Sequence, residues 1–380
     1  MRGVRLAILI AVAAALMFVP NLQNSAGFSA YYLVYAYFVF FWIAQATSWN
    51  ILSGYSGYFS FGQGAFYGLG VYTAGDLVTR EGFNYFVTIP IAGVLGGVLG
   101  AAVGALAFRL GSLRGEIFAL LTLAVTFTLA SVAALSEWVD GGQGIAIPVP
   151  EYSERLGDFQ DLVYRLGLAV AALAVVSAFL IQHSRFGWGL FSIRDEEGVA
   201  EELGVPTFRY KMIAITVTGA LGGLSGAVAA LQIGYLTPEG VFNLTVPLLV
   251  IVMCVLGGRR HWLGPIIGAL VIYALQERLT NSRLDEYGQI VLGVILVVII
   301  LFAPEGLYER LRQPRRAALA GVALVGGTAV AYFADWGIAT DWLSTGLAAA
   351  TVVLLVARPK RRRGGRRGRS AAPAGEAPAQ

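Results

Sequence analysis

Long apolar runs, separated by short polar connections, make up most of this chain. Each is about as long as the ~20 residues that an α-helix needs to cross a bilayer, or somewhat shorter. Within the runs apolar residues are continuous rather than alternating with polar ones, which excludes a membrane β-barrel. The pattern predicts an all-α fold, a polytopic helical membrane protein with about 10–12 transmembrane segments and glycine-broken helices. The twelve expected segments are 6–20, 31–52, 57–78, 86–108, 115–136, 163–183, 212–233, 244–257, 262–278, 288–303, 317–333 and 342–357.

Composition agrees with this pattern. Hydrophobic residues make up 57% of the chain and charged residues 13%, whereas a soluble domain carries about 25% charged residues. The chain has 48 glycines, which in a lipid environment let helices approach closely. Its single cysteine, Cys254, can form no disulfide within the chain and belongs to no cysteine cluster for a metal.

The distribution of positive charge predicts the orientation. If the N-terminus is cytoplasmic, the inside connections hold 22 of the 27 Lys and Arg, as the positive-inside rule requires. Both termini are then cytoplasmic, on the same side as the charged segment 184–211. The five remaining cations are Arg80, Arg155, Arg165, Arg278 and Arg283.

The two ends of the chain differ from its middle. The first run is interpreted as a retained helix, with a cleaved signal peptide over residues 6–19 as the alternative. At the other end, 313–357 holds two additional apolar segments. The tail 358–380 is too polar to fold and is expected to be a disordered cytoplasmic segment. Its basic cluster favours contact with anionic membrane lipids and no binding to nucleic acid.

The chain lacks the motifs of an enzyme. Its two lysines, Lys211 and Lys360, do not follow a phosphate-binding glycine loop, and His183 and His261 form no metal-binding motif. We therefore predict no catalytic residue, no metal site and no cofactor bound by this chain. Because ionisable residues are scarce within the spans, a proton pump is disfavoured, and a permeation path without its own energy source is favoured.

Glycines are densest between Asn50 and Tyr72. They weaken a helix there, and unwound backbone inside a membrane is tolerated only where protein or water covers it. We interpret this region as part of a translocation path, and its alternative role is a tight helix crossing. The candidate path residues are Ser60, Gly62, Gln63, Gly64 and Phe66. Glycines four apart form similar stripes elsewhere, at Gly96, Gly100 and Gly104 and at Gly222 and Gly226.

The run ILSGYSGYFSFGQGAFYGLGVYTAG resembles the permease subunits of branched-chain amino acid ABC importers, and among these the M-type subunit. Further stretches agree in the same order, over roughly residues 46–307: RGEIFALLTL, GGQGI, GYLTP and LGG followed by GPIIGA. The resemblance implies an ABC importer permease domain over 1–312, in the cytoplasmic (inner) membrane. It also implies a heterodimer with a second permease subunit, two ABC ATPase subunits that use ATP, and an extracytoplasmic substrate-binding protein.

Segment 184–211 resembles the cytoplasmic coupling motif of such permeases. A short amphipathic helix is expected from Ile193 to Leu203, ended by Gly204 and Pro206. The resemblance implies that it seats in a groove of the ATPase. The matching residues are Arg194, Glu197, Ala200, Glu201, Gly204, Tyr210 and Lys211. Glu202 and Pro206 depart from the family pattern, and the alternative is a solvated helix without a partner.

A second glycine-rich site lies at 257–269. Gly257, Gly258, Gly264 and Pro265 are candidates for hinge or packing positions. Arg259 and Arg260 could contact an ATPase, although a positively charged inside turn is the simpler interpretation.

Three alternatives to a branched-chain or hydrophobic amino acid importer are open at this point. One is a urea or short-chain amide importer of the same architecture. The others are a stand-alone channel or secondary carrier, and a membrane scaffold.

Overall fold

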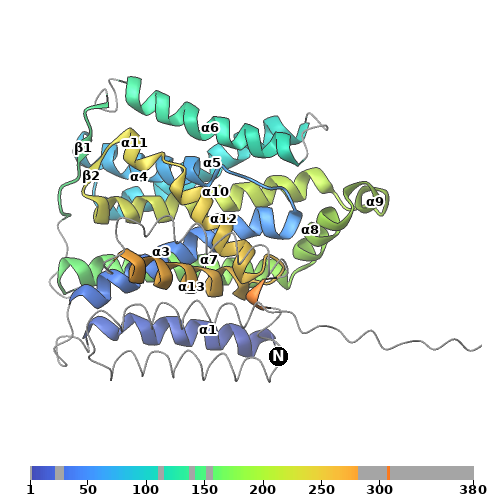
Figure 1. Ribbon diagram of the computed structural model, residues 1–380, viewed down its shortest axis with the longest axis horizontal. Coiled ribbons are helices and arrows are strands. Elements are labelled where there is room, and N and C mark those ends of the chain that lie inside the picture. The colour runs from blue at the N-terminus through green and yellow to red at the C-terminus, as the bar shows by residue number, and fades with distance from the viewer. Residues whose placement is uncertain are drawn as a thin grey trace, which may run out of the picture.

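The computed structural model describes residues 2–21, 30–109, 115–136, 142–150, 157–280 and 306–308. Most of the long helices run in a common direction and form one bundle, with a small two-stranded sheet at one end (Figure 1). The helices are α1 (Arg2–Met17), α3 (Ala30–Trp49), the π-helix η1 (Asn50–Gly54), α4 (Gln63–Thr79), α5 (Tyr85–Arg109), α6 (Glu116–Leu135), α7 (Phe159–Gln182), α8 (Arg185–Asp195), α9 (Glu197–Glu202), α10 (Thr207–Ile233), α11 (Pro238–Val241), α12 (Thr245–Gly257) and α13 (Leu263–Thr280); the strands are β1 (Ile145–Ala146) and β2 (Tyr235–Leu236).

The predicted all-α membrane fold is confirmed. Within the part of the chain that the structure describes, each of the first nine predicted segments coincides with a long helix, and six helices are long and apolar enough to cross a membrane. The predicted segments 288–303, 317–333 and 342–357 lie outside the described residues. So do the predicted C-terminal region 313–357 and the tail 358–380.

Helix α10 occupies the centre of the bundle, where glycines let its neighbours approach its backbone. A Cβ atom at Gly96 of α5 would overlap the carbonyl oxygen of Gly219 of α10, and one at Gly219 would overlap the carbonyl oxygen of Gly96. The stripe that includes Gly96 and Gly100 therefore packs on α10. Gly222 and Gly226 instead contact α4, at Phe66 and Tyr67, so α10 uses two glycine faces for two neighbours.

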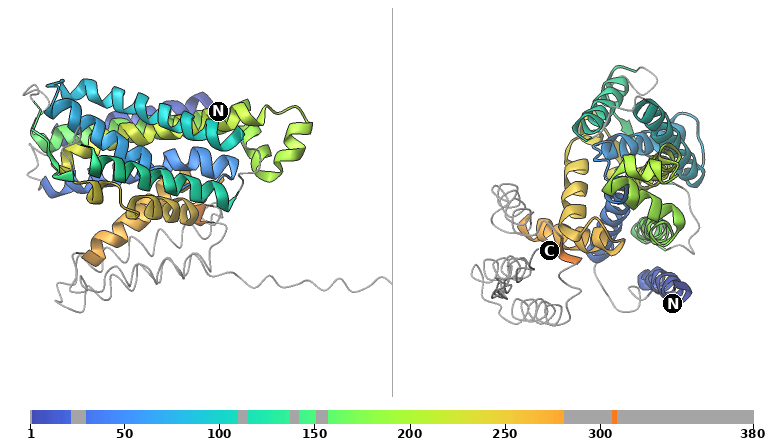
Figure 2. Two further views of the ribbon diagram at one scale, coloured as in Figure 1. Left: turned by 90° about the horizontal axis from the view of Figure 1, so that it is seen from above. Right: turned by 90° about the vertical axis from the view of Figure 1, so that its right-hand side faces the viewer.

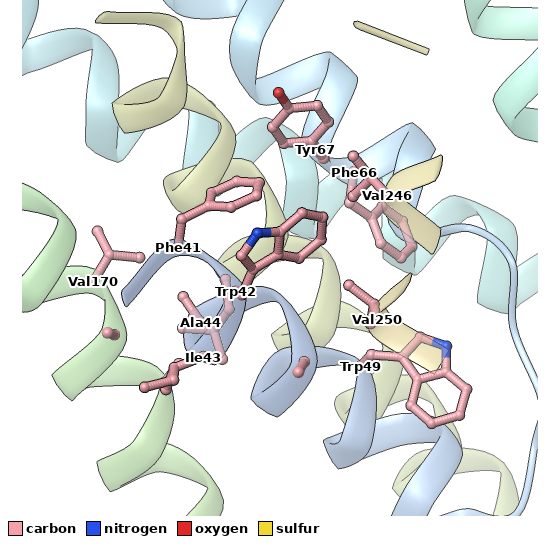
Figure 3. Close-up of a cluster of buried hydrophobic side chains, with 14 of the residues drawn as sticks. Phe41, Trp42, Ile43, Ala44, Trp49, Phe66, Tyr67, Val170, Val246 and Val250 are labelled. Carbon is pink, nitrogen blue, oxygen red and sulfur yellow. The ribbon is translucent and has the colours of Figure 1, made fainter. Parts of the chain in front are cut away.

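Helix α3 forms the core on the other side of α10. Its aromatic side chains pack against residues of α4, α7 and α12 (Figure 3). The rings of Phe41 and Tyr67, for example, meet edge to face with centroids 5.6 Å apart. The labelled members of this cluster are Phe41, Trp42, Ile43, Ala44, Trp49, Phe66, Tyr67, Val170, Val246 and Val250.

The two ends of the bundle differ. At one end β1 and β2 pair antiparallel, with Ile145 opposite Leu236 and Ala146 opposite Tyr235, so two of the motifs shared with the permease family, GGQGI and GYLTP, meet. At the other end α8 and α9 extend beyond the long helices (Figure 2). The N-terminus of α1 lies at this second end as well (Figure 1).

Candidate functional site

The glycine-rich stretch breaks the helical path between α3 and α4, as the sequence indicated. The chain leaves α3 through the π-helix η1, a feature that the sequence did not predict and that is frequent at functional sites. From Gly57 to Phe61 it has no helical structure. Side chains bond two of its backbone groups: Trp49 Nε1 donates to the Ser60 carbonyl oxygen (2.7 Å), and Phe61 N–H donates to Thr122 Oγ1 (2.9 Å). We refer to residues 50–62 as the broken stretch.

A cluster of buried polar side chains adjoins the broken stretch. Gln63 Nε2 donates to Gln45 Oε1 and to Ser48 Oγ (2.8 Å), and Thr218 Oγ1 donates to the Ser48 carbonyl oxygen (2.9 Å). Among the described residues, the buried atoms Gln45 Nε2 and Gln63 Oε1 of this cluster have no hydrogen-bond partner. Unpaired buried polar atoms of this kind indicate a place for water or a polar ligand. Sequence reasoning singled out Gln63 but missed the three polar partners from α3 and α10, which carry no motif.

The candidate path residues all lie in or beside this polar cluster. These residues are buried by other helices of the same chain. Gly64 faces Thr126 and Pro247, and Phe66 faces Gly222. The structure thus brings Ser60, Gly62, Gln63, Gly64 and Phe66 together at the start of α4. Their contact with a transported substrate stays a prediction.

The charged segment 184–211 forms two helices, and the expected single helix from Ile193 to Leu203 is wrong. Helix α8 ends at Asp195, and Glu196 takes an extended conformation (φ −158°, ψ 105°) before α9 begins. The break turns the carboxylate of Glu197 into the protein, where it meets a lysine. The expected end of the helix is confirmed, since Gly204 adopts a left-handed conformation (φ 85°) just after α9.

The predicted coupling residues divide between an inner and an outer surface. Arg194, Glu197, Ala200 and Lys211 turn towards the bundle, and Tyr210 packs edge to face on Phe186 with ring centroids 5.1 Å apart. The outer surface of α9 instead presents Glu201 and Gly204 beside Val199 and Leu203. Leu203 is 80% exposed and Val199 50% exposed. The residues that match the family motif therefore do not form a single exposed surface.

The inner surface of α9 contains a buried ion pair. Lys211 Nζ donates to Glu197 Oε1 (2.6 Å) and to Tyr58 Oη (3.2 Å), while Tyr58 Oη donates to Glu197 Oε2 (2.6 Å). The charged side chains are only 7% and 8% exposed. Around them Tyr58, Phe108 and Phe118 form an aromatic box, with Lys211 Nζ 4.9 Å from the ring centroids of Tyr58 and Phe108. Tyr58 was missed because a tyrosine within an aromatic stretch gives no polar signal.

Arg194 makes a second contact between this segment and the broken stretch. Its Nη1 donates to the Gly54 carbonyl oxygen (2.6 Å). Burial, followed by the nearby charges of Arg259 and Arg260, lowers the pKa of Arg194 to about 10. The guanidinium therefore remains protonated at neutral pH and donates a charge-assisted hydrogen bond.

One prediction concerns the end of α9. Gly204→Ala is expected to destabilise the last turn of α9 by about 1–2 kcal/mol, the cost of a left-handed backbone for a residue with a Cβ. Faster hydrogen exchange of the α9 amides would show it. Gly198→Ala is the control in the same helix, because a Cβ there meets only open space and one glutamate oxygen at 4.0 Å. Equal exchange rates in the two variants would contradict the expectation.

The family follows from the comparison with known proteins. The model of the family "Branched-chain amino acid transport system / permease component" matches residues 31–300, which is more than half of the chain. The chain belongs to this family. The match confirms the resemblance seen in the sequence, and it includes the broken stretch, the polar cluster and both helices of the charged segment.

Several curated permeases are similar to this one. The high-affinity branched-chain amino acid transport system permease protein LivM of Escherichia coli (strain K12) is 27% identical over 288 residues, 69% of this chain and 66% of LivM. The probable branched-chain amino acid transport permease protein LivH of Methanocaldococcus jannaschii is 23% identical over 267 residues, 65% of this chain and 82% of LivH. An autoinducer 2 import system permease protein, LsrC of Klebsiella pneumoniae, is 28% identical over 185 residues, 47% of this chain and 50% of LsrC. This permease thus spans just under two thirds of the length of LivM. No solved structure matches it.

The second glycine-rich site of the permease is the crossing of α12 and α13. A Cβ atom at Gly257 would overlap the carbonyl oxygen of Gly264, and one at Gly264 would overlap that of Gly258. Pro265 is buried in the first turn of α13, where a proline costs no hydrogen bond. These four residues therefore lie in close packing, and a hinge motion at them stays a prediction. Arg260 in the connecting turn lies 3.7 Å from Asp195 of α8 in an exposed ion pair.

Proposed function

We propose that this chain is the membrane-spanning permease subunit of an ATP-driven importer of branched-chain or other hydrophobic amino acids. Its family and its similarity to LivM over most of the chain support this proposal. In it, a second permease subunit forms a heterodimer with this chain, two separate ATPase subunits use ATP, and a substrate-binding protein delivers the amino acid from outside. This chain binds no cofactor in that scheme.

The observation that supports an ATPase partner is the outer surface of α8 and α9. These helices extend beyond the bundle (Figure 2) and expose two large apolar side chains, Val199 and Leu203, four residues apart. Exposed apolar groups beside charged ones are typical of a protein interface. We define Val199, Glu201, Leu203 and Gly204 as the docking surface. The N-terminus of α1 lies at the same end of the bundle (Figure 1), and the first turns of this helix carry Arg2 and Arg5. This arrangement supports a cytoplasmic position, at the inner membrane, for the N-terminus and for α8 and α9.

The docking surface can be tested by association. In the double variant Val199→Asp/Leu203→Asp, two carboxylates replace the apolar side chains, and we expect co-purification of the ATPase subunits to fall at least about tenfold, as for the loss of an interface anchor. Val149→Asp is the matched control, because Val149 is 65% exposed at the opposite end of the bundle. Unchanged ATPase binding by the double variant would sink the assignment of the docking surface.

Transport itself can be tested with the assembled complex in liposomes. Uptake of labelled leucine should require ATP on the ATPase side and the binding protein on the other. If the purified chain alone moved leucine without any ATPase, the proposal of a passive subunit would be wrong.

A further inference from the structure

Helix α9 has only six residues, and its backbone connections at both ends are irregular. Glu196 is extended before it and Gly204 is left-handed after it. A short helix between two such connections cannot pass on a displacement as a continuous rod. Besides the backbone of residues 203–206, which leads into α10, side-chain contacts on the inner surface of α9 and the end of α8 can therefore carry a movement of the docking surface to the long helices.

Two of these contacts are hydrogen-bonded and lead to the same few residues of the broken stretch. The first is the buried cluster of Glu197, Lys211 and Tyr58. The second is the hydrogen bond from Arg194 to the Gly54 carbonyl oxygen. Gly57 lies between them, and a Cβ at this position would come within 3.0 Å of the Arg194 side chain. Helices α8 and α9 are thus attached to residues 54–58, from which 139 and 140 positions of sequence separate the bonded residues.

The contacts continue from these residues to the buried polar cluster. The Ser60 carbonyl oxygen is held by Trp49, and Phe61 N–H is held by Thr122. Gln63, at the start of α4, is bonded to Gln45 and Ser48 of α3. A continuous series of packed and hydrogen-bonded residues therefore connects the exposed surface of α9 with the candidate path residues.

The buried ion pair opposes a separation of α9 from the start of α10. In a low-dielectric environment, separating two opposite charges costs far more than it does in water. A displacement of α9 that left Lys211 behind would separate the charges and break the hydrogen bonds to Tyr58. The start of α10, which carries Lys211, and the broken stretch, which carries Tyr58, are therefore expected to move together with α9.

We propose that Glu197, Lys211 and Tyr58 form the joint through which the docking surface moves the broken stretch, with Arg194 as its second attachment. The joint depends on the proposed function, in which the ATPase binds α8–α9. The three residues act as positioning residues that touch neither ATP nor the transported amino acid. The aromatic box of Phe108 and Phe118 surrounds the joint, so the ends of α5 and α6 follow the same displacement.

The test compares uptake with ATP hydrolysis in the complete complex, reconstituted into liposomes with binding protein and labelled leucine. For Glu197→Gln and Lys211→Met we expect leucine taken up per ATP hydrolysed to fall about tenfold, within the range of effects measured along coupled networks. Tyr58→Phe, which removes one hydroxyl and keeps the packed ring, should lower the ratio about threefold. The exchanged pair Glu197→Lys/Lys211→Glu restores opposite charges and should recover part of the loss.

Two control variants separate transmission from stability. Tyr164→Phe removes another buried hydroxyl, which donates to the Leu16 carbonyl oxygen (3.0 Å) between α1 and α7. Glu116→Gln removes an exposed carboxylate at the start of α6. Both should leave the ratio of uptake to hydrolysis unchanged.

The outcomes distinguish the two proposals. If the unmodified complex shows no ATP-dependent uptake, the proposed function fails, and the joint fails with it. A different result refutes only the joint: the unmodified complex transports leucine, and Glu197→Gln and Tyr58→Phe take up as much leucine per ATP hydrolysed as it does. A loss of uptake and hydrolysis in equal proportion in these variants has the same meaning. If Lys211→Met does not assemble, Tyr58→Phe and the exchanged pair Glu197→Lys/Lys211→Glu still test the joint.

Discussion

Lys211→Met is expected to lower the free energy of unfolding by about 3–5 kcal/mol, because the Glu197 carboxylate then stays buried without its positive partner. The side chain of Glu197 is 8% exposed, so water cannot replace the lost interaction. Unfolding of the purified permease in detergent micelles, followed by the signal of its tryptophans, measures the change.

The double variant Glu197→Gln/Lys211→Met is the informative comparison. It removes both charges and leaves neutral groups of similar size, so most of the lost stability should return. Arg209→Met, two residues earlier in α10, is the control for loss of an exposed positive charge and should change stability by at most about 0.5 kcal/mol. A double variant as unstable as Lys211→Met alone would show that the charges are not paired.

Gly96→Ala is expected to have the second largest effect, a destabilisation of about 1–3 kcal/mol or more. The added methyl group overlaps the carbonyl oxygen of Gly219, a backbone atom that moves only if α5 and α10 separate. Gly219→Ala should be equally harmful, since each glycine faces the other's carbonyl oxygen. The yield of monodisperse protein and its thermal midpoint in detergent report the effect.

The neighbouring glycine supplies the control for this crossing. A Cβ at Gly97 lies 3.4 Å from the Ala220 Cβ, an ordinary van der Waals contact. Gly97→Ala should therefore be neutral or stabilising, because alanine favours a helix over glycine by about 0.5–1 kcal/mol. Equal losses at positions 96 and 97 would mean that helix propensity, not the close crossing, determines the effect.

The arrangement of spans could be predicted because it follows from a local property of the chain. Continuous apolar runs have few alternatives to a membrane helix, so α5, α7 and α10 appear where hydropathy indicated them. The dense glycines between Asn50 and Tyr72 likewise predicted the break in the helical path between α3 and α4. The π-helix η1 was not predictable, since its wider turns depend on packing by distant residues, and a Cβ at Gly54 would come within 2.8 Å of the Arg259 carbonyl oxygen.

The candidate site was only partly predictable for a related reason. The sequence did not predict the break at Glu196, and it did not separate Glu197, which is buried, from Glu201, which is exposed. The partner of Glu197 lies 14 positions away and Tyr58 lies 139 positions away. Such pairings arise from tertiary contacts and leave no periodic signal. The family motif marked the segment correctly, but it did not separate residues that hold the segment in place from residues on its outer surface.

The length of α10 gives its central position a further consequence. This helix begins four residues before Lys211 and ends at Ile233, next to β2. Its 27 residues make a lever about 40 Å long, so a tilt of about 5° about one end displaces the other by about 3.5 Å. Where Gly96 meets Gly219 and Gly70 meets Gly223, backbone packs directly on backbone, so no side chain at these two crossings can absorb such a tilt. A small rotation at the α9 end would therefore displace the β1–β2 sheet. Helix α10 would in this way link movements at the two ends of the bundle.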